Sequence, residues 1–490
     1  MKQLSGLDAG FLYMETPTTF GHISSLSVYD KPDKDSENPY EILRGRLEQR
    51  LPLLEPLRRR LVEVPFQLDH PWWIEDPDFD LEFHVRHIAV PGSGGPRELS
   101  DLVGRLISRP LDRTRPLWEA YAIEGLRKGR WAAFIKMHHA TIDGAAGALM
   151  TMMLLDAEAG AEPPPMPETP PTEAVPTPLE MMGRTMMRYT SRPQRFFAAQ
   201  NRMMGDLLRI ATNNANQARS MWSFPKPGRA DSAAGASRSL VSPRTPFNKS
   251  ISPHRRFAYR SFSLDDAKAV KNHFEASIND VVMAACAGAL RRYLVRHEAL
   301  PDQPLVAMVP VSIRTGEEED MWTNRVSSIF SRLPTHIDDA AERVRYARDA
   351  MESAKSSFDL VPTESVIDFA QFASPALVSQ AAGLMTRTHL ANQVRQPSNV
   401  VISNVPGPRQ ALYMGSARLR HYYPVSTIAE GQGLNITVQS YEDKLDLGLV
   451  GCRELLPDLW HLIDDFEVEI AELVALTDSG PDAEVEAEAG

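Results

Sequence analysis

The residues best suited to chemistry lie in one short stretch, "KMHHATIDGAAG", residues 136–147. Two histidines, His138 and His139, end an apolar run, and Asp143 and Gly144 follow after a short gap. Histidine is the side chain whose ordinary pKa, about 6.5, lets it take up a proton near neutral pH and return it. The stretch therefore suggests a general base, a metal site, or only a turn from strand to helix that contains histidine.

The sequence around these residues predicts how they are presented. "WAAFIKMHH" is typical of a buried strand, and "DGAAGALMTMMLLDAEAG" is typical of a buried helix that ends at Gly160. Because neighbouring side chains of a strand point to opposite faces, His138 and His139 should have different roles. One histidine should face a cleft while the other packs, and Asp143 should cap the helix or form a salt bridge.

Two further kinds of site require residues that this stretch lacks. A helical zinc site of the HExxH type needs a glutamate between its two histidines, and neither that pattern nor a nearby cysteine is present. A serine hydrolase would carry a G-x-S-x-G turn, which the chain also lacks. We therefore expect no metal ligand here and keep two interpretations, a general base or a structural histidine in a turn.

The bulk composition limits the classes of function. The chain has 490 residues, which suggests two or three domains, and a net charge of −11, which gives a nucleic-acid partner no overall electrostatic support. Its two cysteines, Cys286 and Cys452, favour a reducing compartment. The sequence contains no signal peptide and no apolar run of about 18 residues. We expect a cytoplasmic protein, with peripheral contact to the inner membrane or to lipid droplets left open.

Composition divides the chain into two structured blocks. Residues 1–160 and 251–477 both mix helix and strand patterns, which predicts two α/β sandwich domains with mixed sheets. Residues 161–250 separate them and begin with the Pro-rich, acidic run "AEPPPMPETPPTEAVPTP", which is typical of an extended linker. Residues 478–490 form an acidic tail that should be disordered.

A basic amphipathic segment lies inside the connection, at residues 180–210. Arginines recur there at helical spacing on one side and methionines on another, although Pro193 should break or kink a helix. Such a helix can lie on anionic lipid. It can equally pack its methionines on a domain and leave its arginines in solvent, and the sequence does not decide between the two.

Several stretches together carry a resemblance to a known family. "HHATIDG" resembles the HHxxxDG signature of the CoA-dependent acyltransferase superfamily, which includes chloramphenicol acetyltransferase-like enzymes and peptide condensation domains. Other stretches resemble, in order, elements of one branch, the bacterial wax ester synthase/diacylglycerol acyltransferases. They are "LSGLDAGFLYMETPTTFGHISSLSVYD", "RPLDRTRPLWEAYAIEGL", "SINDVVMAACAGALRRYL", "VPVSIR", "NRVSS", "SNVPGP" and "GQGLNITVQSY". One departure is Thr323, where the family pattern has a glycine before Asn324, and it concerns the geometry of this loop.

The resemblance implies two chloramphenicol acetyltransferase-like domains with a solvent channel between them. His139 is then the general base at the centre of the channel, and His138 lines or braces it. Asp143 is structural, and its expected partner is an arginine, with Arg314 as the candidate. Asn279 is the candidate donor to the oxyanion, with a helix cap as the alternative.

The same resemblance suggests the PLW element, Pro116, Leu117 and Trp118, as substrate-binding residues beside the acyl pocket, although Trp118 at a strand start is also a typical core residue. It implies no metal and no cofactor, since acyl-CoA is a substrate. The acceptor would be diacylglycerol, giving triacylglycerol, or a long-chain alcohol, giving a wax ester. Two alternatives remain: a condensation-domain-like or other acyltransferase with a different acceptor, and a non-catalytic protein that binds lipid surfaces. Acceptor preference, acyl length and oligomeric state are not encoded in any motif.

Overall fold

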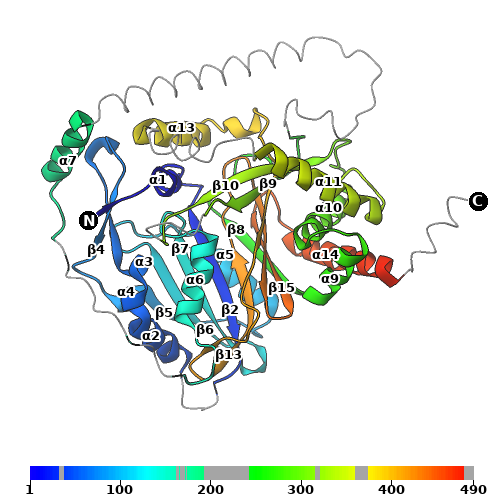
Figure 1. Cartoon of the computed structure of the whole chain (residues 1–490), viewed down its shortest axis with the longest axis horizontal. Helices are drawn as coiled ribbons and strands as arrows, with labels where there is room; N and C mark the ends of the chain where they lie inside the picture. Colours follow the sequence, from blue (N-terminus) through cyan, green and yellow to red (C-terminus); the bar gives the residue numbers. More distant parts are fainter. Residues whose placement is uncertain are drawn as a thin grey trace, which may run out of the picture.

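The computed structural model describes residues 1–32, 38–161, 165, 172, 174–191, 242–314, 321–358 and 374–478 of the chain. Most of the strands in these residues form two six-stranded mixed sheets. In Figure 1 the two sheets lie side by side, and helices α9, α10, α11 and α14 gather beside the C-terminal one. The predicted α/β architecture with mixed sheets is confirmed.

The N-terminal sheet has the strand order β12-β13-β2-β7-β6-β5. Its strands are β2 (His22–Tyr29), β5 (Val85–Ala89), β6 (Trp118–Glu124), β7 (Trp131–His138), β12 (Tyr413–Met414) and β13 (Ala417–Val425). All eight residues of β7 are buried. A central strand covered on both faces carries mostly apolar residues, which explains why this run does not alternate, and its buried Lys136 is paired with Glu119.

The C-terminal sheet has the order β10-β9-β11-β14-β15-β8. Its strands are β8 (Arg255–Ser263), β9 (Leu305–Ser312), β10 (Val326–Leu333), β11 (Val400–Val405), β14 (Leu434–Tyr441) and β15 (Lys444–Cys452). The helices beside it are α9 (Leu264–His273), α10 (Ile278–Arg296), α11 (Ala340–Phe358) and α14 (Leu459–Asp478). The apolar run "VVMAACAGAL" lies in α10 and is buried throughout, which makes this helix the centre of the C-terminal core.

Strand β13 joins the two halves of the chain. It pairs with β2 from the other end of the sequence, with Leu419 opposite Tyr29 and Val425 opposite Ser24. Boundaries drawn at 1–160 and 251–477 therefore do not describe the sheets, since β12 and β13 complete the N-terminal one. A pairing between such distant segments leaves no local pattern in the sequence and therefore could not be predicted from it.

The two sheets meet where β13 approaches β15. The backbone N–H of Tyr422 donates to the carboxylate of Asp446, with 2.6 Å between nitrogen and oxygen. Gly448 of β15 lies against β13, where an added Cβ would come within 1.8 Å of the backbone oxygen of Pro424. A glycine is therefore required for the close approach of the sheets.

The remaining elements are eight helices, a small sheet and four short 3-10 turns in the described residues. The helices are α1 (Gly6–Tyr13), α2 (Pro39–Arg50), α3 (Glu55–Arg58), α4 (Leu81–His84), α5 (Pro96–Ile107), α6 (Gly144–Leu154), α7 (Pro178–Ser191) and α13 (Pro375–Arg387). Strands β1 (Lys2–Gln3), β3 (Arg59–Val62) and β4 (Trp72–Glu75) form a small third sheet. Short 3-10 turns are η1 (Leu51–Leu53), η2 (Pro65–Gln67), η3 (Arg127–Gly129) and η5 (Leu390–Asn392). Helices α1 and α13 were not predicted from the sequence, and of the small sheet only the strand at "WWIED", which is β4, was predicted.

The connection between the two blocks is described only in part. The predicted buried helix ends at Leu154 rather than at Gly160. Helix α7 covers the start of the predicted basic amphipathic segment, and the rest of that segment, with the break or kink predicted at Pro193, lies outside the described residues. Most of the Pro-rich run and the acidic tail from residue 479 also lie outside them.

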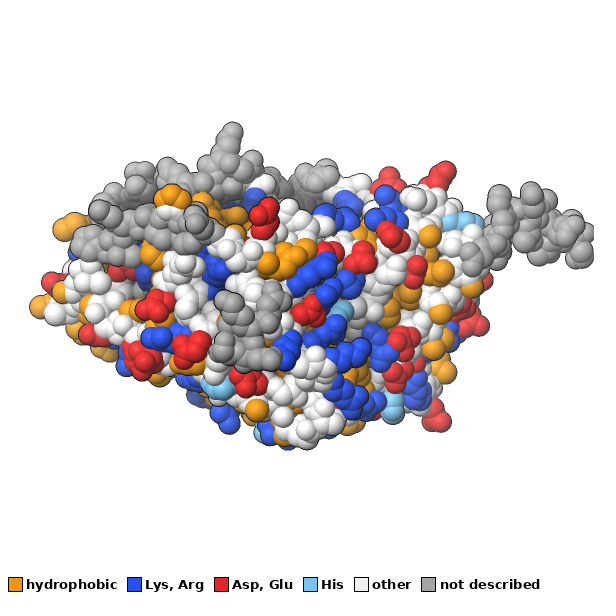
Figure 2. All heavy atoms as spheres, turned by 90° about the horizontal axis from the view of Figure 1, so that it is seen from below, with side chains coloured by type: hydrophobic (Ala, Val, Ile, Leu, Met, Phe, Trp, Pro, Cys, Tyr) orange, Lys and Arg blue, Asp and Glu red, His pale blue; other side chains and the backbone are white. Residues whose placement is uncertain are grey.

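The surface carries charge of both signs. Figure 2 shows Lys and Arg side chains gathered near the middle of the lower face, with Asp and Glu side chains between and around them. The net charge of −11 is therefore compatible with locally basic surface. Within the described part of the chain, no helix combines the length and the apolar character needed to cross a bilayer.

Candidate active site

The turn from β7 to α6 is fixed at both of its ends. At the strand end, the backbone N–H of His139 donates to the oxygen of Gly21 at 2.7 Å, and that of Thr141 donates to the oxygen of His138 at 2.9 Å. At the helix end, Asp143 is the N-cap, and its Oδ1 accepts from the Ala146 N–H at 2.8 Å. The predicted capping role of Asp143 is confirmed, and the turn holds His139 in one place.

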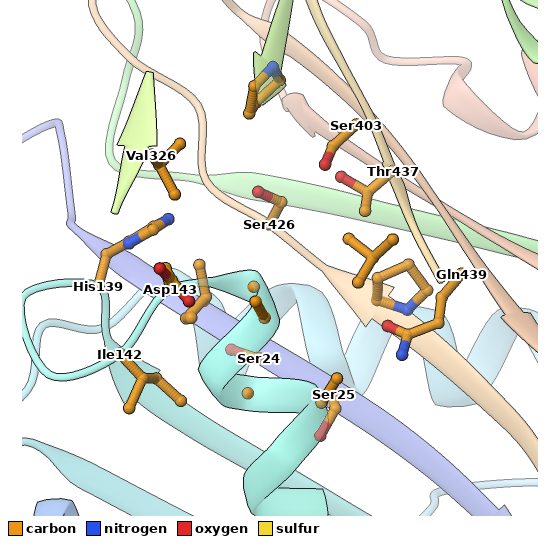
Figure 3. A pocket seen from close by; sticks show the side chains of 18 of the residues that line it. Ser24, Ser25, His139, Ile142, Asp143, Val326, Ser403, Ser426, Thr437 and Gln439 are labelled. Carbon is orange, nitrogen blue, oxygen red and sulfur yellow. The ribbon is translucent and has the colours of Figure 1, made fainter. Parts of the chain in front are cut away.

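His139 faces a cavity of about 460 Å³ that lies between the two sheets. One side is lined by β2, β7 and α6, through residues such as Ile23, Met137 and Ala148. Strand β13, the neighbour of β2 in the same sheet, also lines it, and the other side is lined by β9, β10, β11 and β14, through residues such as Val311. Figure 3 shows the imidazole of His139 pointing into this space. The site is therefore assembled from both halves of the chain.

The imidazole of His139 is held by two neighbours. The ring of Phe11 stacks on it, with 4.0 Å between ring centroids and an angle of 7° between the planes. Its Nδ1 lies 3.2 Å from Oδ1 of Asn324, which accepts a hydrogen bond. That contact places a proton on Nδ1 and leaves the lone pair on Nε2.

The environment of His139 keeps the ring neutral. Burial lowers its pKa below 6.5, and this effect outweighs its own backbone carbonyl, Asp143 and Asn324, which act in the opposite direction. A neutral imidazole with a free Nε2 lone pair is the form that can act as a general base.

His138 packs behind the turn and does not line the cavity. It is 1% exposed, its Nδ1 accepts from the Ala140 N–H at 3.0 Å, and its Nε2 lies 3.1 Å from Oε1 of Glu15. Burial would raise the pKa of Glu15, but His138 and then Arg113 lower it below its usual range. The expectation that the two histidines have different surroundings is confirmed, and His138 braces the turn.

Asp143 joins the turn to the C-terminal half. Its Oδ2 accepts from Nη2 of Arg314 at 2.8 Å and from the backbone N–H of Arg325 at 3.0 Å. The expected pairing of Asp143 with Arg314 is confirmed. Arg314 also donates to the backbone oxygen of Thr323 at 2.8 Å. Thr323 is not among the residues with positive φ, so the glycine of the family pattern is not required there.

The PLW element lies in the core rather than at the cavity. Leu117 and Trp118 are each 1% exposed, and neither they nor Pro116 is among the described residues that line the cavity. Trp118 donates from Nε1 to the backbone oxygen of Leu57 at 2.8 Å. The backbone oxygen of Leu117 accepts from the N–H of His138 at 2.9 Å, so the element supports the end of β7.

Asn279 is not brought to His139. It lies in the first turn of α10, and it is not among the described residues that line the cavity. The capping of α10 is done by its neighbours Ser277 and Asp280, which form a reciprocal capping box. Helix α10 packs in the C-terminal core, and Asn279 lies outside the cavity because it belongs to this helix.

The cavity contains hydroxyl groups that were not predicted as site residues. In Figure 3 Ser403, Ser426 and Thr437 lie across the cavity from His139. The hydroxyl of Thr437 donates to Oδ1 of Asn435 at 2.8 Å, and Nδ2 of Asn435 lies 3.2 Å from the Ser426 oxygen, to which it donates. The Ser426 hydroxyl proton is not used in this chain of bonds and can point to a ligand. Thr437 and Gln439 alternate with apolar residues in β14, and this alternation is the sequence pattern from which their exposure to a cavity could have been predicted.

Replacing Arg314, the cation that pairs with Asp143, tests how much this ion pair contributes to holding the two halves of the chain together. Arg314→Met should lower the free energy of unfolding by about 3 kcal/mol, because the Asp143 carboxylate stays buried without its ion-pair partner. Arg260→Met, which breaks exposed ion pairs on β8, should cost at most about 1 kcal/mol. Thermal and denaturant unfolding of both variants measure the difference, and adding Asp143→Asn to Arg314→Met should recover part of the loss. Equal stability of the two single variants would contradict the prediction.

Family models match most of the chain. A model for the wax ester synthase/diacylglycerol acyltransferase catalytic domain matches residues 4–282, and a model for the C-terminal domain of that family matches residues 322–474. The O-acyltransferase WSD of Acinetobacter baylyi is 34% identical over 474 residues, which are 96% of each chain. A Mycobacterium tuberculosis protein named as a probable diacylglycerol O-acyltransferase is 34% identical over 471 residues, 95% of this chain and 97% of its own length.

Solved structures agree with this assignment. The wax ester synthase/diacylglycerol acyltransferase from Marinobacter aquaeolei VT8 is 29% identical, covers 97% of this chain and 100% of its own, and superposes with a TM-score of 0.68. The first condensation domain of the calcium-dependent antibiotic synthetase, 16% identical with a TM-score of 0.54, covers 97% of this chain and 96% of its own and shares the fold. The chain belongs to the wax ester synthase/diacylglycerol acyltransferase family.

Proposed function

We propose that this protein transfers an acyl group from acyl-CoA to the hydroxyl of a lipid alcohol, either diacylglycerol or a long-chain alcohol. One observation carries the proposal: a neutral histidine, His139, faces an apolar cavity that both halves of the chain enclose. The relatives named as diacylglycerol O-acyltransferase and as O-acyltransferase WSD support the same reaction.

The geometry supports a direct transfer with His139 as general base. Nε2 of His139 takes the proton of the alcohol as the alcohol oxygen attacks the thioester carbonyl carbon. The C–S bond then breaks, and the imidazolium returns the proton to the departing CoA thiolate. No acyl-enzyme is needed, because both substrates meet in one site and the acceleration comes largely from their orientation.

The negative charge that forms on the carbonyl oxygen needs a donor. Asn279, the candidate from the sequence, does not line the cavity, whereas Ser426 does and has a hydroxyl proton to give. We therefore assign the donor role to Ser426. One such donor is typically worth about 3 kcal/mol in the transition state.

The lining of the cavity suits a lipid chain. Its volume of about 460 Å³ is in the range of small-molecule pockets, and aliphatic side chains such as Ile142, Val311 and Val405 form much of its wall. An acyl or alkyl chain gains free energy on leaving water for such a wall. The interpretation of His139 as a structural histidine does not account for a cavity at its ring.

An enzyme that takes its acceptor from lipid must touch a lipid surface. Helix α7 carries apolar side chains that could make this contact. Met181 packs against the small sheet beside Val64, whereas Leu179 is 78% exposed on the same helix. Phe66, at the tip of the neighbouring η2 turn, is 81% exposed. Figure 1 places α7 beside the β3–β4 hairpin at one edge of the molecule. We propose that this edge inserts Phe66 and Leu179 into the surface of a membrane or lipid droplet.

Substitution of the base tests the reaction. His139→Ala should reduce release of CoA from long-chain acyl-CoA, with diacylglycerol or hexadecanol present, by at least about 100-fold, since a general base contributes that much. His297→Ala, at the C-terminal end of α10, should leave turnover unchanged. Thiol release with a colorimetric reagent and thin-layer analysis of the ester measure the outcome. Retained turnover in a folded His139→Ala protein would remove His139 as base, and lipid binding without CoA release in the unaltered protein would favour a non-catalytic role.

The pH dependence should reflect the lowered pKa of His139. The neutral imidazole is the active base, so a pKa below 6.5 keeps the enzyme active as the pH falls through 6.5. Activity should then be lost only at lower pH. The acidic limb of kcat/KM against pH measures this, with circular dichroism at each pH to exclude unfolding. An acidic limb centred at or above pH 6.5 would contradict the assignment.

Membrane contact is tested with sedimented vesicles. The double variant Phe66→Ser/Leu179→Ser should bind vesicles of phosphatidylglycerol at least about tenfold more weakly than the unaltered chain, because two apolar side chains no longer enter the lipid. Val468→Ser, which alters an exposed apolar residue of α14, should not change binding. Equal binding of the double variant and the unaltered protein would show that this edge does not meet lipid.

A further inference from the structure

Helix α1 carries a buried carboxylate close to the candidate site. Asp8 is 5% exposed, and its Oδ2 accepts from the hydroxyl of Ser5 at 2.6 Å. Its Oδ1 accepts two hydrogen bonds from one residue of the C-terminal half, the backbone N–H of Asn324 at 2.9 Å and its side-chain Nδ2 at 2.6 Å. All of these donors are neutral. The cap of α1 is made by Ser5, which accepts from the Asp8 N–H, so the cap does not use Oδ1 of Asp8.

Asn324 connects this carboxylate to His139. It is 1% exposed, and its Nδ2 donates both to Asp8 and to the backbone oxygen of His139, the latter at 2.8 Å. Both amide protons are therefore used, and Oδ1 is the atom that faces Nδ1 of His139. A flipped amide would turn its oxygen toward the Asp8 carboxylate and the His139 carbonyl, two acceptors, and would lose both bonds.

The orientation of this amide decides which nitrogen of His139 carries the proton. An oxygen facing Nδ1 requires the proton on Nδ1, which leaves the Nε2 lone pair for the substrate hydroxyl. An NH₂ group in the same place would favour the tautomer with the proton on Nε2, which cannot accept the hydroxyl proton. We propose that Asp8 is a positioning residue that acts through Asn324 to hold His139 in its base-competent tautomer. The proposal rests on the proposed role of His139 as general base.

The place of Asp8 on α1 supports this role. Asp8 and Phe11 are three residues apart and therefore share a face of the helix. Phe11 stacks directly on the His139 ring, and Asp8 reaches it through Asn324. Burial raises the pKa of Asp8, which the hydrogen bonds from Ser5 and Asn324 oppose. One face of one short helix thus fixes both the plane and the proton of the imidazole.

Replacing Asp8 with alanine or with asparagine distinguishes a role in positioning His139 from a purely structural role. Asp8→Ala removes the acceptor for Asn324 and should lower kcat for CoA release by roughly 100-fold with KM changed by less than about 3-fold, since the general base is present in the wrong form. Asp8→Asn keeps an oxygen for the two N–H groups and should retain most of kcat. Ser5→Ala removes the cap and the other partner of Asp8, and it should lower the melting temperature while kcat stays within about 2-fold.

A double-mutant cycle identifies the route through Asn324. Asn324→Ala should lower kcat by about as much as Asp8→Ala, and the double variant should lose no more than either single variant, because both act on one bond. If Asp8→Ala does not yield folded protein, the kcat of Asn324→Ala alone tests the proposal. A kcat within about 2-fold of normal in folded Asp8→Ala or Asn324→Ala, with His139→Ala inactive, would overturn this inference and leave the proposed function intact. Turnover by His139→Ala would overturn the proposed function itself.

Discussion

The buried carboxylate of Asp143 is the interaction on which the candidate site depends. One of its oxygens caps α6, and the other accepts hydrogen bonds from Arg314 and Arg325, which flank strands β9 and β10. The cap fixes the turn that presents His139, and the ion pair attaches that turn to the other sheet. Since the cavity lies between the two sheets, the same carboxylate holds the base against the space in which two substrates would meet. A charge buried to this degree stabilises the fold only while its partners stay in place.

Much of the site followed from local sequence patterns. The strand that ends in two histidines, the helix start at Asp143 and the opposite directions of His138 and His139 all follow from spacing and alternation. The family motifs added Arg314 as the partner of Asp143, a pairing that no local pattern could have supplied. Both blocks were recognisable as mixtures of strands and helices, although the membership and order of the strands in each sheet were not.

The parts that were not predicted depend on contacts between distant segments. Helix α1 has few residues and no apolar stripe, so its pattern did not identify it, yet it supplies Phe11 to the His139 ring. Asn324 appeared only as one letter of a motif, and its role depends on Asp8 at the other end of the chain. Asn279 was taken from a motif of the family as a candidate donor, whereas its place outside the cavity depends on how α10 packs. Ser426 follows directly after β13, whose place in the N-terminal sheet is itself a long-range pairing.

The pairing of β13 with β2 has a consequence for synthesis on the ribosome. Strand β2 is among the first segments to emerge, and its partner on one edge is among the last. At roughly 5–20 residues per second, that edge stays unpaired for about 20–80 seconds before β13 has been made. An unpaired strand edge is a template for pairing with other chains. The edge of β2 is therefore open to such pairing until β13 has been made, and neither half of the gene, expressed alone, would encode a complete sheet on the N-terminal side.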